Sequence, residues 1–245
     1  MISHHANGAS TGAGGNGLAV TSEPPAQLLL LPGPINFVTH FNLYALSGLL
    51  NDAYLIGIDT ETKPSFRKGE YHRTSILQLA IRTNANFEST VIVDLMGFGS
   101  DEKLRDLNDV LTPVMQSPTI IKIGQGLKED FKQMYVAYPG LSAVLAVNGV
   151  IEVNWIYRHL YPEIKQDISL KRLALSILNC NLSKGQQMSN WNLRPLSRLQ
   201  SEYAVRDALI LIRLFDVMIC LASESGDFVL DSLLGSLVDG RIIRS

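Results

Sequence analysis

Short apolar runs separated by polar turns dominate the chain from residue 35 onward. Runs of this kind, bounded by Gly, Pro, Asn and charged residues, are typical of buried β-strands. They predict strands at residues 35–40, 53–61, 75–82, 89–96 and 119–124. Most of these strands lie in the first half of the chain.

A period of three to four residues predicts helices between and after these strands. The apolar residues of one such segment fall on a single helical face: Leu104, Leu107, Leu111, Val114 and Met115. We expect Asp101 to cap this helix and Pro118 to end it. Other helices are expected at residues 41–51, 127–138, 152–160, 169–178 and 197–222. Strands first, then strands mixed with helices, then helices predict an α/β domain with a mixed sheet.

The two ends of the chain show no comparable period. Residues 1–26 are rich in Gly, Ala and Ser, and we expect a disordered leader there. Residues 27–222 have the length and apolar content of one domain. Residues 223–245 form an apolar tail whose packing the pattern does not predict.

Composition and charge are those of a compact globular protein, with 46% hydrophobic and 18% charged residues. All 21 basic residues follow residue 62 and the net charge is −2, so any binding of a polyanion must be local. The longest apolar run is too short to span a membrane and is broken by Arg213 and Asp216. Cys180 and Cys220 have apolar surroundings and no metal-type spacing, which predicts buried free thiols. We therefore expect a soluble intracellular protein; the compartment stays open.

Two acids stand at the end of the strand 53–61. Asp59 and Glu61 are two residues apart, so both side chains point to the same face of the strand. Two carboxylates this close repel each other unless a cation lies between them, and oxygen ligands without His or Cys suit Mg²⁺ or Mn²⁺. The alternative, two acids in a solvated loop, is the commoner outcome for so short a motif.

Two further acids occur at comparable places. Asp130 lies one turn into the helix that follows the strand 119–124, after a Gly124-Gln125-Gly126 turn. Tyr203 and Asp207 are four residues apart and therefore share one face of the last long helix. Taken alone, Asp130 is an ordinary first-turn acid and the Tyr-Asp pair is a local contact.

Together, in this order, these residues resemble the three motifs of the DEDD exonuclease superfamily, and Tyr203 marks its DEDDy branch. The segments "SILQLA", "IGQGLKEDFKQM" and "LSKGQQMSNWNLRPLSRLQSEYAVRDALILIRLFD" resemble RNase D and Werner-exonuclease-like 3'–5' exonucleases. The resemblance covers residues 30–222. It implies a ribonuclease H-like α/β fold with a five-stranded mixed sheet flanked by helices. The segment 139–150 is longer and more apolar than the matching link in compact relatives, and we expect a partner surface or an extra hairpin there.

The resemblance also implies two divalent cations, Mg²⁺ or Mn²⁺, and a role for each motif residue. Asp59, Glu61 and Asp207 would hold the ion that activates water. Asp59 would bridge to a second ion held by Asp130, and Tyr203 would orient the attacking water. Clustered acids of this kind form a stable site only when the cations are present.

Contacts to the nucleic acid are expected from the same segments. Gln125 occupies a place where relatives often carry a His or Asn that touches the terminal nucleotide. Lys171, Lys184 and Arg194 could reach phosphates, and a solvated surface is an equal alternative for each. Trp191 could stack on a base, although a core position is the commoner role for a tryptophan.

The leading hypothesis is a metal-dependent 3'–5' exonuclease that releases mononucleotides from single-stranded or overhanging RNA or DNA 3' ends. The alternative is a catalytically weak relative that binds nucleic acid or acts as a dimerising scaffold; such relatives lose metal ligands, whereas all four acids stand here. A third hypothesis, a proofreading module, would need a polymerase on a separate chain. No membrane partner is expected.

Overall fold

The computed structural model describes residues 29–183, 185–224, 230–238 and 241–244, so the expected leader lies outside the described part of the chain. Its strands are β1 (Ile35–Val38), β2 (Ala53–Thr62), β3 (Thr74–Thr83), β4 (Glu88–Asp94), β5 (Ile121–Gly124), β6 (Ala146–Glu152), β7 (Gly235–Val238) and β8 (Arg241–Arg244). Its α-helices are α1 (Leu43–Leu50), α2 (Asp101–Gln116), α3 (Leu127–Ala137), α4 (Val153–Leu160), α5 (Leu170–Leu178) and α6 (Arg198–Glu224). Short 3-10 helices lie at His40–Asn42, Leu95–Gly97, Ser142–Val144 and Leu230–Leu233.

The strands form one mixed sheet in the order β1-β4-β3-β2-β5-β6-β7-β8. β2 lies near its centre, antiparallel to β3 and parallel to β5. β5 and β6 are also parallel, whereas β7 is antiparallel to β6 and pairs with β8 as a hairpin. The mixed α/β fold is confirmed, but the expected number of five strands is wrong. β6 makes six, and the hairpin at the end of the chain extends the sheet to eight in the described residues.

β6 accounts for the apolar character of the segment 139–150. Val147, Val150 and Ile151 of this strand are all buried. The strand is interrupted at Gly149, which has a φ of 64° and where the pairing with β7 shifts register. A Cβ atom at Gly149 would lie 2.6 Å from the carbonyl oxygen of Ile120, so only glycine allows the chain to pass there.

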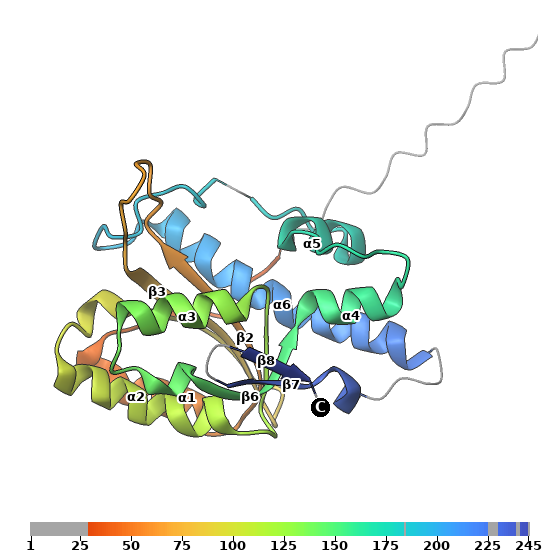
Figure 1. The fold of residues 1–245 in the computed structure, drawn as a ribbon, viewed down its shortest axis with the longest axis horizontal. Helices are drawn as coiled ribbons and strands as arrows, with labels where there is room; N and C mark the ends of the chain where they lie inside the picture. Colours follow the sequence, from red (N-terminus) through yellow and green to blue (C-terminus); the bar gives the residue numbers. More distant parts are fainter. Residues whose placement is uncertain (1–28, 184, 225–229, 239–240, 245) are drawn as a thin grey trace, which may run out of the picture.

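Helices cover both faces of the sheet (Figure 1). Ile56 and Ile58 of β2 point to the face covered by α1, α2 and α3. Leu55 points to the opposite face, covered by α4, α5 and α6. Because side chains alternate along a strand, Asp59 and Glu61 belong to the α6 face and Thr60 to the α3 face.

α6 is the longest of the described helices and crosses the face of the sheet to which Asp59 and Glu61 belong (Figure 1). In its second half Arg213 lies within ion-pair distance of Glu88 and Asp216 pairs with Arg82, which ties the helix to β3 and β4. Within the described residues, none of the helices has both the length and the apolar character needed to cross a membrane.

Two local expectations are wrong. Ser100, not Asp101, caps α2, because its hydroxyl accepts a hydrogen bond from the backbone N–H of Lys103. Cys180 is buried as expected, but Cys220 is exposed. The periodicity does not separate these alternatives, because Cys220 borders the buried stripe of α6.

Candidate active site

Asp59 and Glu61 lie in the last four residues of β2, at the carboxyl end of a strand held on both sides by neighbours. Asp59 lies opposite Gln78 of β3, and Glu61 lies opposite Ile76. Both acids are half-buried. Ligand sites of α/β sheets lie beyond the carboxyl ends of such strands.

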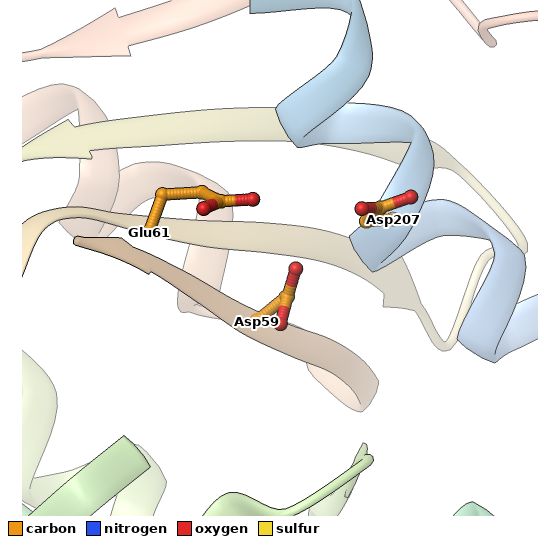
Figure 2. Close-up of side chains that lie close together, drawn as sticks. All are labelled: Asp59, Glu61 and Asp207. Atoms are coloured by element: carbon orange, nitrogen blue, oxygen red, sulfur yellow. The ribbon is translucent and has the colours of Figure 1, made fainter. Parts of the chain in front are cut away.

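Gly57 allows the third acid to approach. A Cβ atom at this position would lie 2.2 Å from the carbonyl oxygen of Ala208, so α6 packs directly against the backbone of β2. Asp207 immediately precedes Ala208 on that helix. One carboxylate oxygen from each of Asp59, Glu61 and Asp207 lies within 4.8 Å of the others. Figure 2 shows Asp207 on its helix facing the two acids of the strand.

Tyr203 lies one turn before Asp207 on α6, and its hydroxyl is close enough to the Asp207 carboxylate for each group to shift the pKa of the other. Its ring packs 6.0 Å from the ring of Trp191, centroid to centroid. Burial raises the pKa of the Tyr203 hydroxyl, and the negative charges of Asp207, Glu61 and Asp59 raise it further. At neutral pH the hydroxyl is therefore protonated and can donate a hydrogen bond.

Asp130 approaches from the α3 face of the sheet. It lies in the first turn of α3, and its Oδ1 accepts a hydrogen bond of 3.0 Å from the Thr60 hydroxyl. Thr60 stands between Asp59 and Glu61 on β2, so it links Asp130 to their strand. Asp130 is close enough to raise the pKa of both Asp59 and Glu61. The structure thus brings three predicted acids into one cluster and places the fourth beside it.

Glu152, at the end of β6, positions the start of α3. Its two carboxylate oxygens accept hydrogen bonds from the backbone N–H groups of Gly126 and Leu127, at 2.7 and 2.8 Å. Gly126 has a φ of 82°, which glycine adopts without strain. A buried carboxylate that accepts the free N–H groups of a helix start stabilises that start. Glu152 therefore contributes to the placement of Asp130 one turn later.

A cavity of about 350 Å³ opens over the acids. It joins the end of β2 to the start of α5, to the segment before α6 and to α6 itself. Its lining residues are Asp59, Thr60, Glu61, Gln125, Ser169, Leu170, Lys171, Leu182, Ser183, Gln187, Tyr203 and Asp207.

Burial raises the pKa of all four acids, and repulsion from the other acids of the cluster adds to it at Asp59 and Glu61. Burial raises the pKa of Asp59 well above its usual range, and the charges of Asp130, Asp207 and Glu61 add to this. Burial, followed by repulsion from Asp207 and Asp130, raises the pKa of Glu61 to about 9. Burial also raises the pKa of Asp130 and of Asp207 to about 7 each. The cluster therefore resists carrying its full negative charge at neutral pH.

The donor set fits a hard divalent cation. In the part of the chain that the structure describes, none of the four acids forms an ion pair with a lysine or arginine. The grouped donors are carboxylate oxygens only, which suits Mg²⁺ or Mn²⁺ better than zinc. A divalent cation would offset the repulsion that raises these pKa values.

The predicted nucleic-acid contacts have different positions. Gln125 lines the cavity, and its Nε2 donates a hydrogen bond of 2.6 Å to the carbonyl oxygen of Ile168, so it also holds the segment before α5. Lys171 lines the cavity as well. Lys184 lies outside the described residues.

Arg194 is not among the residues that line the cavity. Its guanidinium makes two hydrogen bonds to the Asp94 carboxylate, at 2.9 and 2.6 Å, and further ones to the backbone carbonyls of Trp191 and Ser75. Trp191 itself is fully buried in the core. In this structure Arg194 connects the loop before α6 to β3 and β4.

Sequence reasoning missed two residues that shape the site, Gly57 and Thr60. Gly57 is a lone glycine within an apolar strand, and such a glycine signals close approach of another backbone. Thr60 lies between the two acids of the first motif, at a position for which the spacing of the acids requires no particular side chain. For Glu152, the family resemblance implies a structural role, because relatives often carry an Asp there, but it does not identify the contacts. The contacts of Glu152 could not be predicted, because the N–H groups that it binds are 25 and 26 residues away.

Comparison with known proteins identifies the family of the chain. The profile of the 3'-5' exonuclease family matches residues 35–219. The Exonuclease mut-7 homolog of Homo sapiens is 25% identical over 183 residues, which cover 69% of this chain and 20% of that protein. The chain spans between 20% and 39% of the length of the curated relatives it matches.

Solved structures share the fold, and two of them serve as examples. The Aedes aegypti Nibbler EXO domain superposes with a TM-score of 0.68 at 21% identity, covering 82% of this chain and 94% of that one. Trypanosoma brucei RNase D in complex with RNA U12 gives a TM-score of 0.62 at 16% identity, covering 76% and 62%. The profile covers most of the chain, and the motif residues follow one another in the order Asp59, Glu61, Asp130, Tyr203 and Asp207. The chain therefore belongs to the 3'-5' exonuclease family, in its DEDDy branch.

Proposed function

We propose that this chain is a metal-dependent 3'–5' exonuclease that hydrolyses phosphodiester bonds at single-stranded or overhanging ends and releases mononucleotides. The observation that carries the proposal is the cluster of Asp59, Glu61 and Asp207 at the floor of the cavity, where their oxygens lie within 4.8 Å of one another. Three carboxylates at this spacing repel one another without a cation. Burial raises the pKa of all three, and repulsion raises the pKa of Asp59 and Glu61 further.

Two groups of acids would hold two Mg²⁺ or Mn²⁺ ions. Asp59, Glu61 and Asp207 would hold one, and Asp59 together with Asp130 would hold the other. When bound, such a pair lowers the pKa of the attacking water and neutralises charge on the attacking and leaving oxygens. Thr60 and Glu152 keep Asp130 in reach of Asp59 through the 3.0 Å hydrogen bond and the start of α3.

Tyr203 would orient the attacking water. Its hydroxyl remains protonated at neutral pH, because burial and the surrounding acids raise its pKa. The hydroxyl lies near Asp207 at the acid cluster. In the reacting complex it would donate its one hydrogen to the water oxygen instead of to Asp207, and so hold the water in line with a phosphorus atom. This is a positioning role for the water, and the proton leaves with solvent.

The cavity favours an unpaired end over a base pair. Its volume of about 350 Å³ is close to the lower limit of small-molecule sites, which suits one nucleotide residue. Gln125 and Lys171 lie in its wall, where an amide and an ammonium group can contact a base edge and a phosphate. An end that enters alone is cut one residue at a time, so mononucleotides are the expected product.

The test is a digestion of 5'-labelled single-stranded RNA and DNA oligomers with Mg²⁺, with Mn²⁺ or with chelator. We expect a ladder of one-nucleotide steps that shortens from the 3' end and needs metal. Asp59→Asn should lower the rate by at least about 10²–10³-fold, because it removes charge stabilisation at the reacting phosphate. Tyr203→Phe should lower the rate by about tenfold or more, because the water loses its orientation.

Asp106→Asn provides a matched control, because Asp106 is an exposed acid on α2. It should digest like the parent chain. Tight binding without digestion in either metal would support the alternative of a nucleic-acid-binding or dimerising scaffold. Digestion that survives Asp59→Asn would contradict the assigned site.

A further inference from the structure

The connection between β2 and β3, residues 63–73, forms an arm that projects beyond the carboxyl end of β2 (Figure 1, orange). We call it the β2–β3 arm. Its cations are Lys63, Arg67, Lys68 and Arg73, and its one acid is Glu70. It therefore carries a strong local positive charge in a chain whose net charge is −2.

The acid of the arm, Glu70, interacts with other groups of the arm itself. Glu70 Oε1 lies 2.9 Å from His72 Nε2, and its other oxygen accepts a hydrogen bond from the backbone N–H of Phe66 at 3.3 Å. Across the described ranges, none of the four cations forms an ion pair. Arg67, Lys68 and Arg73 are exposed. Their charge is available to a partner.

Two aromatic rings lie among these cations. Phe66 is 73% exposed and Tyr71 is 59% exposed, although both belong to residue types that usually bury most of their surface. Exposed rings interleaved with Lys and Arg are typical of surfaces that bind single-stranded nucleic acid, because bases stack on the rings while cations contact the phosphates. A solvated charged loop has no comparable need for the rings.

The arm is held in place at both its tip and its base. Gly69, with a φ of 84°, allows the turn in which the Glu70 N–H donates to the Arg67 carbonyl at 3.1 Å. At the base, the Tyr138 hydroxyl donates to the Thr74 carbonyl at 2.7 Å. The Arg73 guanidinium lies 5.9 Å from the centre of the Tyr138 ring. A preorganised surface binds at a lower entropy cost than a loose one.

The arm begins at the acid cluster. Lys63 follows Glu61 by two residues, and the tip at Gly69 lies at most about 26 Å from Glu61 along an extended chain. A stacked strand advances by about 3.4 Å per nucleotide, so the arm can contact the strand within roughly seven nucleotides of the reacting phosphate. The cavity includes the end of β2, where the arm begins, so a strand whose 3' end enters the cavity can pass over the arm.

We propose that the β2–β3 arm binds the unpaired strand upstream of the terminal nucleotide, through bases stacked on Phe66 and Tyr71 and phosphates held by Arg67 and Lys68. This proposal rests on the proposed function, which places the 3' end in the cavity. Stacked bases and phosphates are common to RNA and DNA, so both are recognised. The arm gives the enzyme a preference for long single strands over short ones.

The test measures binding by fluorescence anisotropy in the Asp59→Asn background with Mg²⁺, so that the oligomer is not degraded. Labelled single-stranded RNA and DNA of about 20 nucleotides and of about three nucleotides are compared, because only the longer reaches the arm. The variants are Arg67→Ala/Lys68→Ala and Phe66→Ala/Tyr71→Ala. The charge-matched control is Lys103→Ala/Arg105→Ala on α2.

We expect each arm variant to reduce the affinity advantage of the long oligomer by about tenfold or more. Loss of two cations should also lower the slope of log Kd against log salt by about 1.4. The control should change neither quantity. An unchanged ratio in both arm variants would overturn the proposal, and equal losses on a blunt duplex would overturn the stacking of unpaired bases.

The outcome is separable from the proposed function. If the unmodified chain releases no nucleotides with any metal, the catalytic proposal fails, while the anisotropy ratios still decide whether the arm binds. If the chain digests oligomers and the arm variants keep the parent ratio, only the arm proposal fails. Since the substituted side chains of the arm are exposed, thermal unfolding of each arm variant should match the parent, which excludes misfolding as the cause.

Discussion

Gly57→Ala should disrupt the site without touching any of its acids. The added Cβ would lie 2.2 Å from the carbonyl oxygen of Ala208, whereas ordinary contacts begin at 3.4 Å. Because β2 is held between β3 and β5, α6 has to move away by about 1 Å. Asp207 moves with it, away from Asp59 and Glu61.

The magnitude follows from this shift. A misplacement of about 1 Å in a catalytic constellation costs about 10²-fold in rate, so kcat/KM should fall by about two orders of magnitude. Overpacking of a filled interior costs about 1–3 kcal/mol of unfolding free energy. The activity loss should therefore exceed what partial unfolding explains, because a chain destabilised by this amount stays mostly folded.

The assay combines kcat/KM on a labelled single strand, the Mg²⁺ concentration for half-maximal rate, and unfolding in urea. Gly48→Ala is the control, because Gly48 is exposed in α1 and a Cβ there meets nothing within 4 Å. It should keep full activity and gain up to about 1 kcal/mol of stability. If Gly57→Ala keeps full activity and the same Mg²⁺ concentration for half-maximal rate, contact between α6 and β2 does not position Asp207.

Three further predictions address charge. Burial followed by repulsion raises the pKa of Glu61 to about 9, and burial raises the pKa of Asp207 to about 7. The unfolding free energy of the metal-free chain should therefore fall from about pH 5 to about pH 9, at about 1.4 kcal/mol per pKa unit, and Mg²⁺ should restore more of it at the alkaline end in thermal unfolding scans. Glu152→Gln should cost about 1–2 kcal/mol in urea unfolding and lower the rate, because the start of α3 loses its charged acceptor. Arg194→Ala should cost about 3 kcal/mol, because it leaves the carboxylate of Asp94 unpaired, and should leave the salt dependence of oligomer binding unchanged.

The apolar pattern predicted the elements whose signal is local. β2 through β5 and α2, α3 and α6 occur where alternation or a helical period is strong. β6 was not predicted, because Asn148 and Gly149 interrupt its apolar run. At this interruption the chain packs closely against the backbone of Ile120, and this contact between residues distant in sequence cannot be read from the local pattern. The β7–β8 hairpin was not predicted either, because its position in the sheet depends on the pairing of β7 with β6.

The residues of the candidate site could be predicted from their types and their order along the chain, because the same chemistry requires the same acids. The distances between these acids could not be predicted, since they depend on Gly57 and on the packing of α6 against β2. Arg194 illustrates the same limit. Its charge near the last motif suggested phosphate binding, but the carboxylate that binds its guanidinium is 100 residues away.

Diffraction from crystals grown with Mn²⁺ would show whether Asp59, Glu61 and Asp207 share an ion, because an anomalous difference map locates the ion independently of any activity. We expect a peak at about 2.1 Å from carboxylate oxygens of these three acids, and its loss in Asp59→Asn. Empty density among these three acids at saturating Mn²⁺, with the ion bound elsewhere or not at all, would contradict a shared ion at this site.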